Sequence, residues 1–307
     1  MHLAEGILPL THAAGWSALA GAALVWSVRG ERACGASEPR STSLVAGATS
    51  LLFAATLLPI PVPVVGATSH LCLTPVLALI LGVRRVFWPT FFVVLLQAAL
   101  FAHGGLTTLG ANAIVLGLVG PLIALGVWHV LKGIGGKDTL CLGIACGIGS
   151  IGIYVTDAVI LALALADVAD PVATFVSVVL GFAPVQLPLA LVEAGVSIAL
   201  VTLLANRKPR LLPGGLRTLR TAASVGMVLS VLLCGTILTG CGYEGVDQGV
   251  FEAAAEGAGR TPAESMIYLG TDEWGSVVSA FVLLGLGFIA GRSWERHFER
   301  DDDALPR

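Results

Sequence analysis

The sequence predicts an all-α fold, a polytopic bundle of membrane-spanning helices, from its composition, its hydropathy and the lengths of its apolar runs. Hydrophobic residues make up 56% of the 307 residues and charged residues only 12%, whereas a soluble domain carries about a quarter charged residues. The mean hydropathy is +0.89. The apolar residues fall into runs near the roughly 20 residues that a helix needs to cross a bilayer. We therefore expect about nine transmembrane helices joined by short loops, in place of two soluble domains.

Seven of the expected helices precede a basic linker and two follow it. The seven apolar runs are 11–28, 43–61, 71–83, 86–102, 111–131, 139–165 and 172–205. The third run is short, so we expect a tilted helix packed inside the bundle, and Pro184 and Pro188 should bend the seventh. Residues 206–220 form the linker. The last two runs are 221–240 and 274–291, with a loop at 242–273 between them.

The basic residues predict the orientation of the helices. With the N-terminus outside, the loops on the inner side hold nearly all Lys and Arg, as the positive-inside rule requires. These inner residues are Arg29, Arg32, Arg84, Arg85, Lys132, Lys137, the stretch 207–220 and Arg292. Arg260 is the exception on the outer side. We expect a multi-pass protein of the cell membrane, surrounded by lipid, with an outer N-terminus and a cytoplasmic C-terminus.

Several function classes lack the residues that they need. The net charge is −3 and no long basic stretch occurs, which argues against nucleic acid as a partner. The six cysteines form no CxxC pair, so neither a zinc ribbon nor a disulfide framework is indicated. No HExxH, GxSxG or Walker pattern occurs, which leaves intramembrane proteolysis and ATP hydrolysis without residues to run them. We expect a protein that is not an enzyme and uses no organic cofactor.

The start of the chain carries the first candidate metal ligands. A histidine at position 2 places the Met1 α-amine, the His2 amide nitrogen and His2 Nδ1 within reach of one cation. Such a planar nitrogen set suits Ni(II), Cu(II) and low-spin Co(II). A histidine can also occupy position 2 by chance, so the interpretation as a metal site depends on the rest of the sequence.

His70 is the candidate for a fourth nitrogen. It follows a loop of small residues that ends at Ser69, and this position fits an interfacial histidine beside a helix cap equally well. Gln97 and the glycine-rich stretch from His103 to Asn112 carry polar groups that could orient metal ligands. The same groups could instead hydrogen-bond between helices and pack the bundle. The expected topology places the loops that carry His70 and His103 on the outer side, together with the N-terminus.

Glu193 and Asp157 lie well inside apolar runs. An ionisable side chain at membrane depth indicates a functional role. For Glu193, ion handling and contact with a partner protein are both open.

These stretches resemble the CbiM family, the membrane substrate-capture component of energy-coupling-factor cobalt transporters, over residues 1–205. The matching residues are Met1-His2 through Glu5-Gly6-Ile7-Leu8-Pro9, His12 to Trp16, Ser69-His70, Gln97, the run from Ala102 to Asn112, and Gln186 to Ala190 with Glu193. Residues 221–307 are similar to CbiN, a small two-span accessory protein, whose acidic glycine-rich loop resembles Gly242 to Gln248. The chain departs from the CbiM pattern after His70, where Leu71 to Pro75 replace a proline and glycines.

The resemblance implies a ligand set. The Met1 amine, the amide and imidazole of His2, and the His70 imidazole would hold the metal. Apart from this implied set, Ser69, Gln97, His103 and Asn112 are the candidate residues that could support the ligands.

The resemblance also implies a function, which is capture of Co(II) as the transported substrate from outside the cell for cobalamin biosynthesis. A transmembrane coupling subunit and cytoplasmic ATPase subunits are the implied partners. Nickel-type relatives share the same N-terminal dipeptide, so uptake of Ni(II) stays open. A membrane metal sensor or scaffold without transport is the alternative from another class.

Overall fold

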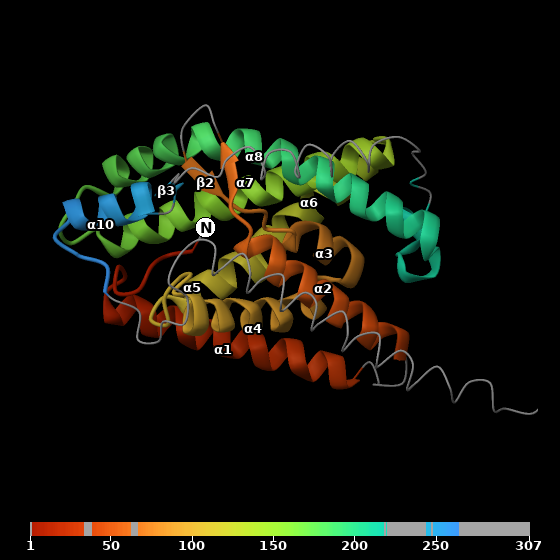
Figure 1. The fold of residues 1–307 in the computed structure, drawn as a ribbon, viewed down its shortest axis with the longest axis horizontal. Helices are drawn as coiled ribbons and strands as arrows, with labels where there is room; N and C mark the ends of the chain where they lie inside the picture. The colour runs from red at the N-terminus through yellow and green to blue at the C-terminus, as the bar shows by residue number, and fades with distance from the viewer. Residues whose placement is uncertain are drawn as a thin grey trace, which may run out of the picture.

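The computed structural model describes residues 2–33, 39–62, 67–217, 219, 244–246 and 248–263. Within these residues the chain is a bundle of long helices that lie lengthwise, with α1 along one side and α8 along the other (Figure 1). The long helices are α1 (Leu10–Ala33), α2 (Pro39–Leu57), α4 (Val83–Phe101), α7 (Asp138–Ala164) and α8 (Pro171–Arg207). The predicted helical fold is confirmed.

Shorter elements connect and extend these helices. Between α4 and α7, α5 (Leu109–Ile114), the π-helical turn η1 (Val115–Val119) and α6 (Gly120–Gly133) follow one another without a break. The other short helical elements are α3 (Thr74–Leu81), the 3-10 turns η2 (Pro209–Leu211) and η3 (Gly214–Leu216), the π-helical turn η4 (Gln248–Glu252) and α10 (Ala253–Gly257).

Four segments in the described chain are long and apolar enough to cross a membrane. They are Val83–Phe101, Leu109–Gly133, Asp138–Ala164 and Pro171–Arg207. A fifth apolar helix, Leu44–Leu57, is shorter. The expected count of about nine spans is therefore not reached in the described residues. The expected spans at 221–240 and 274–291 lie outside those residues.

Two expected spans are shorter in the structure than in the prediction. The run 43–61 ends as a helix at Leu57 and continues into strand β1 (Ile60–Val62). The run 71–83 contains only the eight-residue α3. This helix begins after Leu73, whose φ of 50° lies in the left-handed region, and has a proline in its first turn. It ends at Gly82, which has a φ of 87°, a conformation that glycine adopts without steric cost. Helix α4 starts at the next residue.

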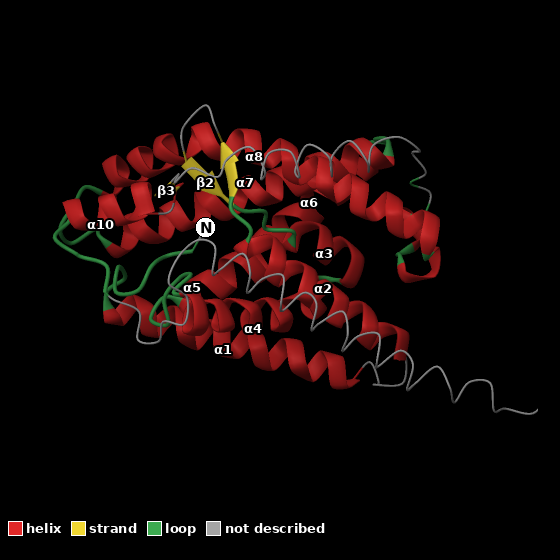
Figure 2. Cartoon of the chain, viewed as in Figure 1, coloured by secondary structure: helices red, strands yellow, loops and turns green. Residues whose placement is uncertain are grey.

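A small sheet, which the all-α prediction did not include, joins distant parts of the chain (Figure 2). Strand β1 pairs antiparallel with β2 (Ala67–Ser69), and β2 pairs in parallel with β3 (Glu244–Gly245). Strands of two or three residues are too short to show an alternating pattern in the sequence. The sheet places Glu244 and Gly245 against the strand that leads to His70.

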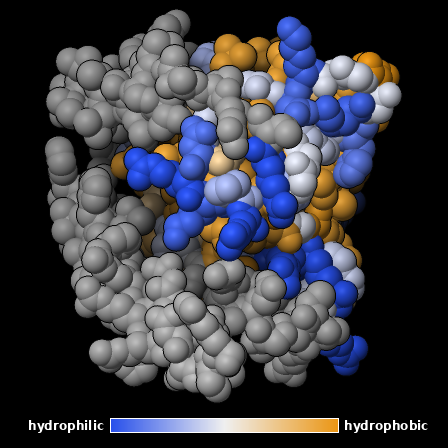
Figure 3. Space-filling model, turned by 90° about the vertical axis from the view of Figure 1, so that its right-hand side faces the viewer, coloured by the Kyte–Doolittle hydropathy of each residue, from blue (hydrophilic) through white to orange (hydrophobic). Residues whose placement is uncertain are grey.

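The two ends of the bundle differ in chemistry. Arg84 lies at the start of α4 and His103 just beyond its end, so a helix of 19 residues, about 28 Å long, separates them. Hydrophilic side chains gather at the end of the bundle where α8 ends (Figure 3). Arg207, Lys208 and Arg210 are exposed there. The segment that starts at His2 is buried instead, with Leu3 and Ile7 fully enclosed.

Candidate metal centre

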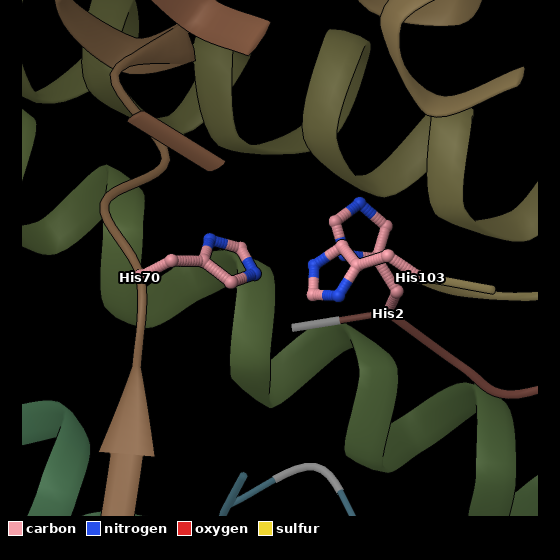
Figure 4. A group of neighbouring side chains, drawn as sticks. All are labelled: His2, His70 and His103. Atoms are coloured by element: carbon pink, nitrogen blue, oxygen red, sulfur yellow. The ribbon is translucent and has the colours of Figure 1, made fainter. Parts of the chain in front are cut away.

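Three imidazole rings from distant parts of the sequence meet in the bundle (Figure 4). His2 comes from the N-terminal segment, His70 from the coil after β2, and His103 from the turn after α4. The ring centroids are 4.5 Å apart for His2 and His103, 5.3 Å for His2 and His70, and 5.2 Å for His70 and His103. Each ring offers a nitrogen that lies within 4.8 Å of the other two.

This spacing suits a shared metal ion. Two imidazole nitrogens on opposite sides of a cation, each bound at roughly 2.0–2.1 Å, are about 4 Å apart. Three nitrogens within 4.8 Å of one another therefore need only a small inward movement to reach one ion. An all-nitrogen set is suited to late transition metals such as cobalt, nickel, copper and zinc.

The surroundings of His2 and His70 favour the neutral form of the imidazole, which binds metal. His2 and His70 are buried, with 3% and 4% of their surface exposed. Burial lowers the pKa of His2, and the neighbouring His103 lowers it further. Burial is also the main cause that lowers the pKa of His70. A metal binds the neutral ring and competes with the proton, so a lowered pKa favours metal binding near neutral pH.

Asn112 and Thr108 fix the backbone next to His2. Asn112 Oδ1 accepts a hydrogen bond from the Leu3 amide at 2.8 Å, and Asn112 Nδ2 donates to the Leu3 carbonyl at 3.1 Å. Thr108 Oγ1 donates to the same carbonyl at 2.5 Å. Leu3 is fully buried, so these side chains take the place of a neighbouring strand. Asn112, predicted as a supporting residue, therefore contacts the backbone of the residue that follows His2.

The rest of the 103–112 turn fits closely around residues 5 and 6. The Glu5 carboxylate accepts hydrogen bonds from the Leu106 amide at 2.5 Å and the Thr107 amide at 3.2 Å. Thr107 Oγ1 accepts one from the Gly6 amide at 3.1 Å. A Cβ atom on Gly105 would lie 2.5 Å from Glu5 Cα, so only glycine permits this approach.

Two other predicted supporting residues contact different parts of the chain. The Gln97 side chain donates to Thr56 Oγ1 at 2.6 Å and so joins α4 to α2. The Gln97 side chain also bonds to the Phe53 carbonyl on α2, so these contacts favour the alternative in which Gln97 packs the helices together. Ser69, directly before His70, accepts a hydrogen bond from Gln186 at 3.1 Å and shares another with the Tyr154 hydroxyl at 3.0 Å.

The acidic residues that the sequence singled out are both buried. Asp157 lies on α7 with 2% of its surface exposed. Glu193 lies on α8, and its carboxylate accepts hydrogen bonds from the backbone amides of Cys72 and Leu73. Met1, which was predicted to supply the amine ligand, lies outside the described residues.

Arg260 is a residue of the site region that the sequence did not reveal as such. Its Nε donates to the Ile7 carbonyl at 3.0 Å, and its Nη2 donates to the carbonyls of Gly6 and Leu8 at 3.1 Å each. The Ala263 amide donates to the Glu5 carbonyl at 2.9 Å. The sequence offered one signal for Arg260, since it is the one basic residue in the expected outer loop. These contacts fasten the segment 260–263 onto the N-terminal segment.

The chain matches a known protein family and several of its members. The family described as "Cobalt uptake substrate-specific transmembrane region", CbiM, matches residues 2–211. The cobalt transport protein CbiM of Geobacter sulfurreducens is 31% identical over 311 residues, which cover 96% of this chain and 89% of that protein. The cobalt transport protein CbiM of Sorangium cellulosum is 34% identical over 213 residues, which cover 69% of this chain and 94% of that protein.

The fold also has solved counterparts. A truncated transition metal transporter superposes with a TM-score of 0.57 and 20% identity, over 67% of this chain and 99% of that one. A second transition metal transporter gives a TM-score of 0.55 at 18% identity. At these identities the likeness concerns the fold alone. The sequence match over most of the chain, on a fold of this kind, shows that the protein belongs to the CbiM family.

Proposed function

We propose that this protein is the substrate-binding component of an energy-coupling-factor transporter and that it captures Co(II) outside the cell for uptake and cobalamin biosynthesis. The observation that supports this most is the group of three imidazoles at the buried N-terminal segment. Its membership of a family described as a cobalt uptake region points the same way. Its task is then to bind and release an ion, and the chain needs no bond-making chemistry of its own.

The proposed ligands would form a planar set of four nitrogens. The Met1 amine, the His2 amide nitrogen and the imidazoles of His2 and His70 would supply them. His103, predicted only as a supporting residue, lies with its ring centroid 4.5 Å from that of His2. We propose that its imidazole would help to hold the ion beside these four nitrogens.

The proposed orientation places this centre on the outer side and the basic end of the bundle in the cytoplasm. The exposed Arg207, Lys208 and Arg210 at one end of the bundle support it, because cytoplasmic loops carry the excess of Lys and Arg. ATP hydrolysis would occur in separate ATPase subunits, coupled through a transmembrane partner. Residues 1–205 would form the capture domain and 221–307 the CbiN-like segment, joined by the linker 206–220.

The segment 244–263 is proposed to assist capture. Arg260 and Ala263 bond to the backbone of residues 5–8, which follow directly on the proposed ligand His2. The segment can therefore hold the N-terminal segment closed over the ion. It also carries Glu252 and Glu256, and carboxylates raise the local concentration of cations outside a site.

The proposal is tested by metal analysis of the purified protein with an unextended N-terminus. We expect one cobalt ion for each chain, and a preference for Co(II) when Ni(II) competes. His70→Ala should weaken binding by far more than 100-fold, the upper range for a residue that only supports a ligand. His129→Ala is the matched control, since His129 is exposed on α6. Preference for Ni(II) would replace cobalt by nickel as the substrate, and normal binding by His70→Ala would contradict the proposed ligand set.

A further inference from the structure

Glu193 is a fully buried carboxylate that bonds to the backbone of another segment. It lies on α8 with no exposed surface. Its Oε1 accepts a hydrogen bond from the Leu73 amide at 2.6 Å and its Oε2 accepts one from the Cys72 amide at 3.0 Å. Two hydrogen bonds from adjacent backbone amides to one side chain bind the 72–73 backbone to α8.

The backbone that Glu193 holds is strained. Leu73 has a φ of 50°, and no side chain of its own segment caps the start of α3 there. In the described residues, the non-glycine residues with positive φ are Leu73 and Ala102. Leu73 lies three residues after His70, and Ala102 lies directly before His103. Strain of this kind persists only where the surroundings enforce it, and it gathers at functional sites.

A second contact from α8 holds the chain on the other side of His70. Gln186 Nε2 donates a hydrogen bond to Ser69 Oγ at 3.1 Å. Gln186 and Glu193 are seven residues apart on one helix, so they lie about two turns apart on the same face. His70 is therefore bracketed by two attachments to α8, one at Ser69 and one at Cys72 and Leu73. In Figure 4 its ring points from this segment toward His2 and His103.

We propose that Glu193 is a positioning residue for the metal centre, which holds the 72–73 backbone so that the His70 imidazole faces His2. This inference rests on the proposed function for its effect on metal binding. The carboxylate does not touch the ion; it acts through His70. The sequence left two roles open for Glu193, ion handling and contact with a partner protein. The proposed role is instead a contact within the chain.

The isosteric variant Glu193→Gln tests the proposal. It keeps one acceptor oxygen and replaces the other by an amide nitrogen, which cannot accept the second backbone hydrogen bond. Two quantities are measured, namely hydrogen exchange of the peptide over residues 69–80 in the metal-free protein, and the affinity for Co(II). Ser197→Ala is the matched control, because Ser197 is an equally buried polar residue on α8.

We expect faster exchange at Cys72 and Leu73 in Glu193→Gln, together with a loss of Co(II) affinity of about 10–100-fold, as for other residues that orient a metal ligand. Ser197→Ala should change neither. Unchanged exchange at these amides would overturn the proposal. Failure of the wild-type protein to bind Co(II) would contradict the proposed function alone, and the exchange measurement would still decide whether Glu193 holds this backbone.

A double-mutant cycle separates positioning from general destabilisation. If Glu193 acts through His70, then Glu193→Gln causes no further loss of affinity in the His70→Ala protein. Cu(II) serves as the probe in all four proteins, because nitrogen sites bind it more tightly than Co(II) and the weakened variants still give a measurable affinity. An equal loss in both backgrounds would overturn the proposal, since it would show that the effect does not pass through His70.

Discussion

Replacing Asn112 by alanine tests how the protein holds its N-terminal segment. Asn112 has 1% of its surface exposed and Leu3 has none. The change removes Asn112 Oδ1, which accepts the hydrogen bond of the Leu3 amide at 2.8 Å. The Leu3 carbonyl keeps its hydrogen bond from Thr108 Oγ1. One buried N–H group is thus left without its partner, which costs about 1–3 kcal/mol.

This cost should be seen in metal affinity because Leu3 directly follows His2. Once the Leu3 amide loses its acceptor, the N-terminal segment detaches more often. Metal binding must then also return His2 to its place in the site. At about 1.4 kcal/mol for each tenfold change, a cost of about 1–3 kcal/mol corresponds to an affinity loss of roughly 5–150-fold.

The assay is Co(II) binding by titration calorimetry on the purified protein in detergent, with Gln97→Leu as the control. Gln97 is equally buried, but its side chain bonds to Thr56 and Phe53 on α2. The Gln97→Leu variant should therefore have a lower thermal stability. Its Co(II) affinity should stay within about twofold of the wild-type value, because the contacts of Gln97 are independent of Leu3. Wild-type affinity in Asn112→Ala, or an equal loss in Gln97→Leu, would refute the reasoning.

Three other features of the site give testable expectations. An N-terminal extension turns the Met1 amine into an amide, so Co(II) binding should be lost, and wild-type affinity in an uncleaved tagged protein would contradict the role of the amine. Arg260→Gln removes donors to the carbonyls of residues 6–8, so hydrogen exchange should rise at residues 5–8. Arg217→Gln, which loses a bond to Leu212, is its control, and equal exchange at residues 5–8 in the two variants would refute the role of Arg260 in holding this segment. Because burial lowers the pKa of His2 and His70, the unfolded state takes up these protons first. Thermal stability of the metal-free protein should therefore fall as the pH drops below about 6.5, and a rise over that range would contradict it.

The helices were the most predictable part of the fold because each depends on a local apolar run. The expected span 86–102 matches Val83–Phe101, and 139–165 matches Asp138–Ala164. The sequence did not predict the sheet because β2 pairs with a strand far along the chain. This strand is β3, and Ala67 lies opposite Glu244. Hydropathy alone could not show that the run 71–83 holds only a short helix. Leu73 is left-handed and its amide bonds to Glu193, which lies 120 residues further along the chain.

The candidate site was predictable in its residues and less so in their roles. A histidine at position 2 and the stretch from His103 to Asn112 mark the site in the sequence itself. The grouping of His103 with His2 and His70 required the structure, because three loops supply the rings. Gln97 and Asn112 look alike as buried amides in a sequence. Only the position of their partners, Thr56 and Leu3, separates helix packing from support of the site.

X-ray absorption at the cobalt edge of the Co(II)-loaded, unextended protein tests the central claim most directly. We expect one cobalt ion for each chain in a shell of nitrogen donors. We also expect the scattering that the outer atoms of imidazole rings produce around a bound metal. That imidazole scattering should decrease in His70→Ala and remain unchanged in His129→Ala. A shell dominated by oxygen or sulfur, or imidazole scattering that is the same in His70→Ala as in the wild type, would contradict the account.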